Sequence, residues 1–236
     1  VCIPNVGKTS EEIISLTKKY KNMPMDLMEW RADWFDEVEN TEKVMEVLKE
    51  VRKALGDTPL LFTFRTKKEG GVCELDVNAY VSLNKAVAAS KMADLIDVEI
   101  FTGDELVTDL IAAIHGCNTK VVASNHDFNK TPAKSDILYR LRKMQDMDAD
   151  IVKIAVMPQS KRDVLTLLAA TEEMVSDYAD RPVITMSMSG LGSISRISCE
   201  VFGSCLTFGA GAAASAPGQI AADQLHRMLL SVHDAL

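Results

Sequence analysis

Short apolar segments recur along the chain, each bounded by Gly, Pro, Asp or Asn. They are rich in Val, Ile, Leu, Phe and Thr, a composition that favours strands. Several contain few polar positions, as expected for strands that are covered on both faces. The eight segments are 1–6, 26–34, 59–65, 95–100, 120–128, 150–157, 182–188 and 205–210.

The segments between these predicted strands carry apolar residues at helical spacing. Val77 and Tyr80 share one predicted face, Ile137 and Leu141 share another, and a last helix is expected over 218–236. Strands that alternate with helices imply parallel βαβ units, and eight such units most simply close into a (β/α)8 TIM barrel, an α/β fold. An open doubly wound sheet is the alternative, but neither a dinucleotide-binding glycine motif nor a P-loop follows the first segment.

Composition narrows the functional classes. Hydrophobic residues make up 47% of the chain and charged residues 25%, which is ordinary for a globular protein. The net charge of -8 and the pI of about 5.1 disfavour a nucleic-acid or anionic-membrane partner. No linker or low-complexity tract interrupts residues 1–236, which are expected to form a single domain. Val1 already lies inside an apolar run, so we expect an N-terminal segment to be missing.

The cysteines are dispersed and form no CxxC pair. They are Cys2, Cys73, Cys117, Cys199 and Cys205. An odd, scattered set of thiols is typical of a reducing compartment and argues against a disulfide framework or a zinc site. We therefore expect a cytoplasmic protein. No apolar run approaches the roughly 18 residues of a membrane span, so no membrane partner is expected.

Lys153 places one ammonium group in the middle of the apolar segment 150–157. A buried cation is costly, so such a lysine either pairs with a carboxylate or loses its proton. A neutral lysine is a nucleophile that can form a Schiff base with a carbonyl compound. Taken alone, the segment favours the structural interpretation, an ion-paired or strand-end lysine.

Further polar residues gather where active sites of (β/α)8 barrels lie, at the carboxyl ends of the predicted strands and in the loops after them. They are Glu29, Arg31, Arg65, Glu69, Asp97, Glu99, His126, Lys153, Ser187, Ser189, Arg196, Ser215 and Gln219. Structural alternatives exist: Glu29 and Arg31 could simply neutralise one another. Asp97 and Glu99 are interpreted as polar fillers of the interior, and a lone His126 could be a structural histidine.

Considered together, these residues favour chemistry. Repulsion from Arg31, Arg65 and Arg196 would help to keep Lys153 neutral, and the guanidinium groups could bind a carboxylate and hydroxyls. No set of His, Asp or Glu has metal-ligand spacing, so a covalent iminium is the expected electrophile, without a metal. His126 is the candidate general acid and base.

Several motifs carry a family resemblance. They are EWR (29–31), FRTKKEGG (64–71), NHDF (125–128), KIAVMP (153–158), SMSGLGSISR (187–196), EVFGS (200–204) and SAPGQI (215–220). In this order, the combination resembles type I 3-dehydroquinate dehydratase along the whole chain. The resemblance implies a homodimeric (β/α)8 barrel that needs no cofactor and acts at the third step of the shikimate pathway, in aromatic amino acid biosynthesis.

The resemblance also implies roles for single residues. The family converts 3-dehydroquinate to 3-dehydroshikimate and water by syn elimination through a lysine Schiff base. By motif, Lys153 would form the imine, His126 would transfer protons and Glu69 would support the histidine. The implied substrate-binding residues are Glu29, Arg31, Arg65, Arg196, Ser215 and Gln219, with Arg196 as the anchor of the substrate carboxylate.

Two other functions stay open at this point. A class I aldolase would also form an imine on Lys153, but would cleave a carbon–carbon bond rather than produce a conjugated enone acid. A non-catalytic barrel that binds a carboxylic acid would need neither Lys153 nor His126.

Overall fold

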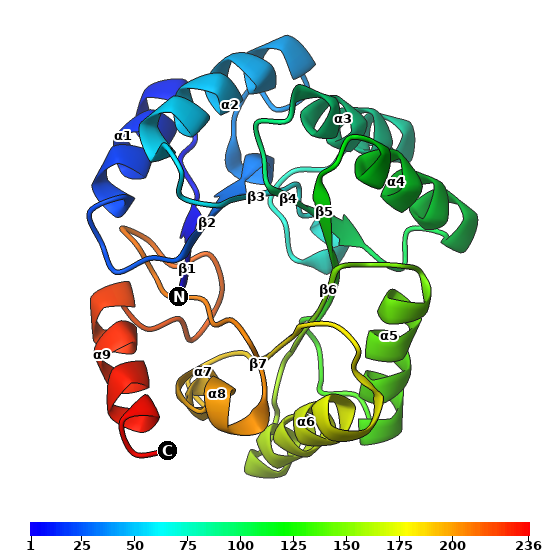
Figure 1. The fold of residues 1–236 in the computed structure, drawn as a ribbon, viewed down its shortest axis with the longest axis vertical. Helices are drawn as coiled ribbons and strands as arrows, with labels where there is room; N and C mark the ends of the chain where they lie inside the picture. The colour runs from blue at the N-terminus through cyan, green and yellow to red at the C-terminus, as the bar shows by residue number, and fades with distance from the viewer.

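The computed structural model describes residues 1–236, and its centre is a sheet of seven parallel strands that follow one another in chain order. The strands are β1 (Cys2–Asn5), β2 (Leu27–Arg31), β3 (Leu60–Thr63), β4 (Leu95–Glu99), β5 (Lys120–Asp127), β6 (Ile151–Val156) and β7 (Val183–Ser187). Figure 1 shows the sheet curled around a central axis with helices on its outside. The first seven predicted strands are confirmed, each slightly shorter than expected.

Helices connect successive strands, as the alternating pattern predicts. The α-helices are α1 (Ser10–Tyr20), α2 (Thr41–Leu55), α3 (Val77–Ser90), α4 (Asp104–Gly116), α5 (Lys134–Asp146), α6 (Lys161–Glu173), α7 (Ser193–Ile197), α8 (Cys199–Phe202) and α9 (Ala222–His233). Shorter turns of helix are η1 (Ala32–Trp34), η2 (Lys67–Glu69) and the π-helical η3 (Met174–Tyr178). None of the helices is both long and apolar enough to cross a membrane.

The eighth predicted strand, 205–210, is not a regular strand. This part of the chain makes only single bridges to the two edges of the sheet, Ser204 with Val183 of β7 and Phe208 with Cys2 of β1. The hydroxyl of Ser204, rather than a backbone carbonyl, accepts the hydrogen bond from the backbone N–H of Thr185 at 3.0 Å. A side chain thus replaces a backbone partner, and no continuous ladder forms.

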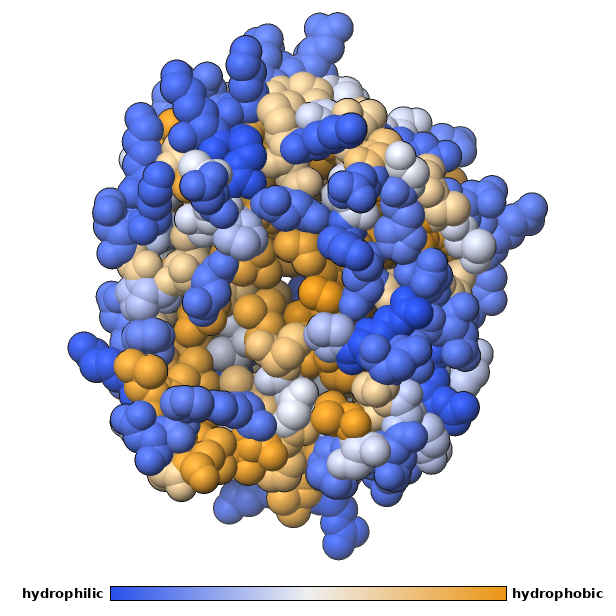
Figure 2. All heavy atoms as spheres, in the orientation of Figure 1, coloured by the Kyte–Doolittle hydropathy of each residue, from blue (hydrophilic) through white to orange (hydrophobic).

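Two apolar layers cover the two faces of the sheet. A cluster of 45 buried residues fills the space between the strands and the surrounding helices. A smaller cluster of nine buried residues lies on the inner face. In Figure 2, hydrophilic residues cover most of the rim, whereas apolar residues surround the central opening and the side where α7 to α9 lie. Because both faces of the strands are covered, apolar residues occupy nearly every position along them.

Alternation along the strands places the charged residues. Side chains an even number of residues apart share one face of a strand, so Leu27 and Glu29 point to the same side of β2, as Val122 and His126 do in β5. The apolar member of each pair belongs to the inner cluster and lies toward the amino end of its strand. The carboxyl end of the curled sheet therefore holds the polar side chains.

Candidate active site

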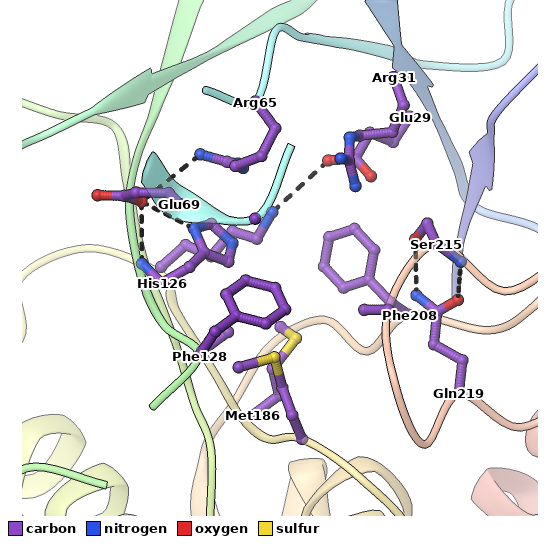
Figure 3. Close-up of a pocket in the computed structure, with 15 residues that line it drawn as sticks. Glu29, Arg31, Arg65, Glu69, His126, Phe128, Met186, Phe208, Ser215 and Gln219 are labelled. Atoms are coloured by element: carbon purple, nitrogen blue, oxygen red, sulfur yellow. Dashed lines mark hydrogen bonds and ion pairs between the residues drawn. The ribbon is translucent and has the colours of Figure 1, made fainter. Parts of the chain in front are cut away.

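Eight of the nine predicted site residues line one pocket at the carboxyl ends of the strands. They are Glu29, Arg31, Arg65, Glu69, His126, Lys153, Ser215 and Gln219. Figure 3 shows Glu69 and His126 on one side of the pocket and Ser215 and Gln219 on the other. Arg196 does not line the pocket, but its Nη1 lies 3.9 Å from the sulfur of Met186, which does.

Lys153 lies in the centre of β6 with only 3% of its surface exposed. Its Nζ is 3.6 Å from Oε1 of Glu29 and 3.5 Å from Oδ2 of Asp97. The ammonium position also lies 4.5 Å from the centre of the Phe208 ring, which favours a cation. The amine is thus held between two carboxylates and an aromatic face.

Two of the three arginines that the sequence placed near Lys153, Arg31 and Arg65, are paired with carboxylates. Arg65 binds Asp97 at 2.8 Å and Glu99 at 3.0 Å, and Arg31 binds Asp33 through two hydrogen bonds of 2.8 Å. The charges of these two guanidinium groups are therefore largely balanced by their own carboxylates.

The acidic residues of β4 have a larger part in the site than the sequence indicated. Asp97 and Glu99 are buried and form the ion pairs of Arg65, and Asp97 also pairs with Lys153. Burial alone would raise the pKa of Asp97, but the charges of Arg65 and Lys153 outweigh it and lower that pKa. Both residues are buried and neither lines the pocket, which agrees with a structural role, but Asp97 also balances the charge of the amine.

The alternative of a Glu29–Arg31 pair is also wrong. Arg31 turns to Asp33, which follows it by two residues, whereas Glu29 accepts a hydrogen bond of 2.9 Å from the hydroxyl of Thr63. The same oxygen of Glu29, Oε1, lies 3.6 Å from Nζ of Lys153. The carboxylate of Asp33 was missed in the sequence, although its spacing from Arg31 was a usable signal.

His126 and Glu69 form a nearly buried acid–base pair. Nδ1 of His126 lies 3.0 Å from Oε2 of Glu69, and the backbone N–H of His126 donates to the same oxygen at 2.9 Å. Burial, followed by the charges of Arg65 and Lys153, holds the pKa of His126 well below its usual value of 6.5. Burial, with the nearby charge of Glu99, raises the pKa of Glu69 to about 8. The shift of His126 favours an uncharged imidazole, the form that accepts a proton.

Arg196 is the one buried guanidinium of the site without a carboxylate partner. Its Nη1 donates to the carbonyl of Phe208 and its Nη2 to that of Pro217, each at 3.4 Å, and its Nε has no partner. Burial lowers the pKa of Arg196 to about 10. A desolvated cation with unused donors is suited to an anionic ligand.

Ser215 and Gln219 lie in the loop between the last irregular segment and α9. Gln219 donates from Nε2 to the Ser215 hydroxyl at 3.0 Å and accepts from the Ser215 backbone N–H at 2.9 Å. These two residues place a polar edge opposite the acid–base pair (Figure 3). They bind each other, so the loop has a defined shape at the pocket.

The apolar wall of the pocket was not identified from the sequence. It is formed by Phe128, Ala155, Met186, Met188 and Phe208. Met186 and Met188 are two apart, a spacing that could have placed both on the inner face of the seventh strand. Phe208 could not be placed in this way, because its segment departs from strand geometry.

Together these groups provide an amine that can form an imine, an imidazole that can move a proton and an arginine that can hold an anion. No group of three or more His, Cys, Asp or Glu side chains is arranged to hold a metal ion. The amine, the imidazole and the arginine together support covalent and acid–base chemistry on a small anionic carbonyl compound.

Comparison with known proteins gives a consistent result along the chain. The model of the type I 3-dehydroquinase family matches residues 1–235. The chain is 50% identical over 236 residues to the 3-dehydroquinate dehydratase of Clostridioides difficile, covering 100% of this chain and 92% of that relative. It is also 50% identical over 235 residues to that of Escherichia coli, covering 100% of this chain and 93% of the relative.

Solved structures agree with these relatives. The type I 3-dehydroquinate dehydratase of C. difficile, solved with covalently modified comenic acid, superposes with a TM-score of 0.97 at 50% identity and covers 100% of this chain and 92% of its own. The 3-dehydroquinate dehydratase of Geobacillus kaustophilus has a TM-score of 0.96 at 37% identity, with 99% of this chain and 90% of the other covered.

Proposed function

This chain belongs to the type I 3-dehydroquinase family, and from that premise we propose that it removes water from 3-dehydroquinate through an imine on Lys153. It is a hydro-lyase of the shikimate pathway, and the product is 3-dehydroshikimate. The observation that carries the proposed mechanism is a buried amine that shares one pocket with a carboxylate-supported imidazole. An aldolase or a simple binding protein is not favoured by these relatives.

Imine formation is the first step. The free-base amine of Lys153 attacks the keto carbon to give a carbinolamine. Its hydroxyl takes up one proton from solvent and leaves as water, so that a C=N bond with a positive charge remains. Oε1 of Glu29 and Oδ2 of Asp97 lie within 4 Å of that nitrogen. Their negative charges stabilise the iminium, and the iminium can accept the electrons of a neighbouring C–H bond.

Proton transfer by His126 completes the elimination. The neutral imidazole takes the proton from the carbon beside the iminium, and the bonding electrons move to the nitrogen to give an enamine. The imidazolium then gives this proton to the β-hydroxyl, which leaves as water while the C=C bond forms. Hydrolysis of the resulting iminium frees the amine. Glu69 binds Nδ1, so Nε2 is the nitrogen that serves the substrate.

Substrate orientation is assigned to the remaining predicted residues. Arg196 would bind the carboxylate, with Ser215 and Gln219 beside it at the polar edge of the pocket. The hydroxyls and ring would lie against Glu29, Arg31 and Arg65. A ligand fixed at its carboxylate presents its keto carbon to the amine at high effective concentration.

Turnover of the purified protein is the test of this function. The product is a conjugated enone acid, so its formation can be followed as new ultraviolet absorbance. We expect Lys153→Ala to abolish this signal and Lys161→Ala, at an exposed position of α6, to keep it. Substantial activity in Lys153→Ala would exclude the imine route.

We further infer a single-domain (β/α)8 barrel in which the irregular segment 204–210 takes the place of the eighth strand. The bridges of Ser204 to β7 and of Phe208 to β1 support closure. We place the protein in the cytoplasm, in line with its five free cysteines.

We also propose a homodimer. Exposed apolar side chains on the adjoining helices α7, α8 and α9, namely Ile194, Val201 and Leu230, support a self-association surface. Light scattering should give twice the chain mass of 25.9 kDa, and a monomer at micromolar concentration would contradict it.

A further inference from the structure

We propose that Arg140 and Asn125 are positioning residues that fix the direction of the hydrogen bonds at the Glu69–His126 pair. Neither residue lines the substrate pocket. The inference rests on the acid–base role proposed for His126. It adds a second set of residues behind the pair, on the side away from Lys153.

The contacts form a continuous chain from α5 to the imidazole. Nη1 of Arg140 donates to Oδ1 of Asn125 at 2.9 Å, and Nδ2 of Asn125 donates to Oε1 of Glu69 at 2.9 Å. The other oxygen of Glu69, Oε2, lies 3.0 Å from Nδ1 of His126. Asn125 precedes His126 in β5, so the two side chains leave the strand on opposite faces. Glu69 joins the two faces over the end of the strand.

The direction of this chain follows from the chemistry of its first member. A guanidinium group only donates hydrogen bonds, so the amide oxygen of Asn125 must face Arg140. The NH₂ group of Asn125 must then face Glu69. Oε1 of Glu69 is thereby an acceptor, and any proton shared by Glu69 and His126 is confined to the line between Oε2 and Nδ1.

Arg140 is itself held in place. Asp136, one turn earlier in α5, accepts from its Nε at 3.3 Å and its Nη2 at 2.8 Å. Asp127 lies 3.9 Å from Nη1, and the ring of Phe101 lies 5.8 Å from the guanidinium carbon. Two carboxylates balance its charge, so its effect on the pair is mainly one of orientation.

Loss of Arg140 would remove the constraint on the amide. The Asn125 side chain could then turn and present its oxygen to Oε1 of Glu69, which is unfavourable because both oxygens are hydrogen-bond acceptors. Glu69 would shift, and the imidazole bound to it would no longer be held at the α-carbon. Proton transfer is sensitive to such displacements, because a misplacement of about 1 Å can cost 10²-fold in rate.

A second cavity lies behind the pair. It is lined by Lys68, Glu69, Phe101, Asn125, His126, Asp136, Tyr139 and Arg140. The side chain of Arg140 is 18% exposed there, so its truncation leaves space at the surface rather than a void in the core. A variant at this position is therefore expected to fold.

The test separates imine formation from elimination. We expect Arg140→Ala and Asn125→Asp to lower kcat by about 10- to 100-fold with KM changed less than about threefold. The fraction of Lys153 that borohydride traps with 3-dehydroquinate should stay near that of the parent protein. The same measurement gives the fraction of protein molecules with a folded site. Arg142→Ala is the matched control, because Arg142 lies on the same helix but stacks on Tyr178, 4.7 Å from the ring centre.

A kcat within twofold of the parent in both variants would overturn the inference, as would a loss of rate that only follows a loss of trapped sites. His126→Ala, measured in parallel, distinguishes a failure of the proposed acid–base role from a failure of the positioning role of Arg140 and Asn125. A near-normal rate in His126→Ala would remove the proposed acid–base role. A slow His126→Ala with normal Arg140→Ala and Asn125→Asp would remove only the inference drawn here.

Discussion

At the scale of single residues, the site depends on how charges are divided among few groups. Arg65 and Arg31 are occupied by carboxylates, whereas Arg196 is buried without one. The paired arginines shape the pocket and the unpaired one has a charge left for a ligand. Lys153 is buried between Glu29 and Asp97, and it is also the group to which imine formation is assigned.

The role of His126 predicts that imine formation and elimination respond differently to its removal, which a measurement of turnover alone would not show. In His126→Ala the amine and its carboxylates are intact, so the imine should still form. Without the imidazole, elimination should slow by about 10²- to 10⁴-fold, the usual effect of one acid–base group. Rapid mixing with borohydride quenching measures both steps. His233→Ala, at an exposed position near the end of α9, should behave as the parent, and a near-normal rate in His126→Ala would contradict the assignment.

The pH dependence follows from the direction of the His126 shift. Burial and the neighbouring cations Arg65 and Lys153 lower the pKa of His126 below 6.5. The neutral imidazole is the base, so activity is retained at pH 6.5 and is lost as the pH falls through this lowered pKa. A profile of kcat/KM against pH should place the midpoint of the acidic limb below 6.5. A midpoint at or above 6.5 would contradict a lowered pKa of His126.

At the scale of elements, the sequence predicted which side chains of the regular strands share the inner face. It did not predict the contacts that form beyond the ends of the strands. Residues such as Glu29 and His126 could be assigned to the inner face because they lie in regular strands with period two. The contact of Glu69 with His126 depends on how η2 lies over β5, and no local pattern contains that information. The partners of Arg65 were likewise beyond prediction, since several carboxylates compete for its guanidinium, whereas the spacing of Asp33 from Arg31 was a usable signal.

The irregular eighth segment shows the same limit. Residues 205–210 have a strand-like composition, but the Ser204 hydroxyl takes a ladder position at the backbone N–H of Thr185. Propensity describes the segment alone, whereas a ladder depends on the register of both neighbouring strands.

Ser204→Ala tests the part of this side chain in closing the sheet. The substitution removes the acceptor of a buried N–H, so the free energy of unfolding should fall by about 1–3 kcal/mol. Urea denaturation measures this change. In the control Ser176→Ala, at an exposed position of η3, the free energy of unfolding should fall by less than about 0.5 kcal/mol. Equal midpoints for the two variants would show that the Ser204 hydroxyl contributes little to closure.

At the scale of the whole molecule, the apolar layers on the two faces of the curled sheet join all elements. The outer cluster includes residues from Val1 to Leu225, so nearly the full length of the chain contributes to one core. We therefore expect one cooperative unfolding transition, with coincident midpoints for circular dichroism and tryptophan fluorescence. Separate transitions for the two probes would contradict the single-domain organisation.

The central claim is that Lys153 forms a covalent imine with the substrate, and peptide mapping tests it directly. The protein is incubated with 3-dehydroquinate and borohydride, digested and analysed by mass spectrometry. The account predicts one substrate-derived group on the peptide that contains Lys153, absent without substrate and absent in Lys153→Ala. Turnover with no adduct, or an adduct on another lysine, would contradict it.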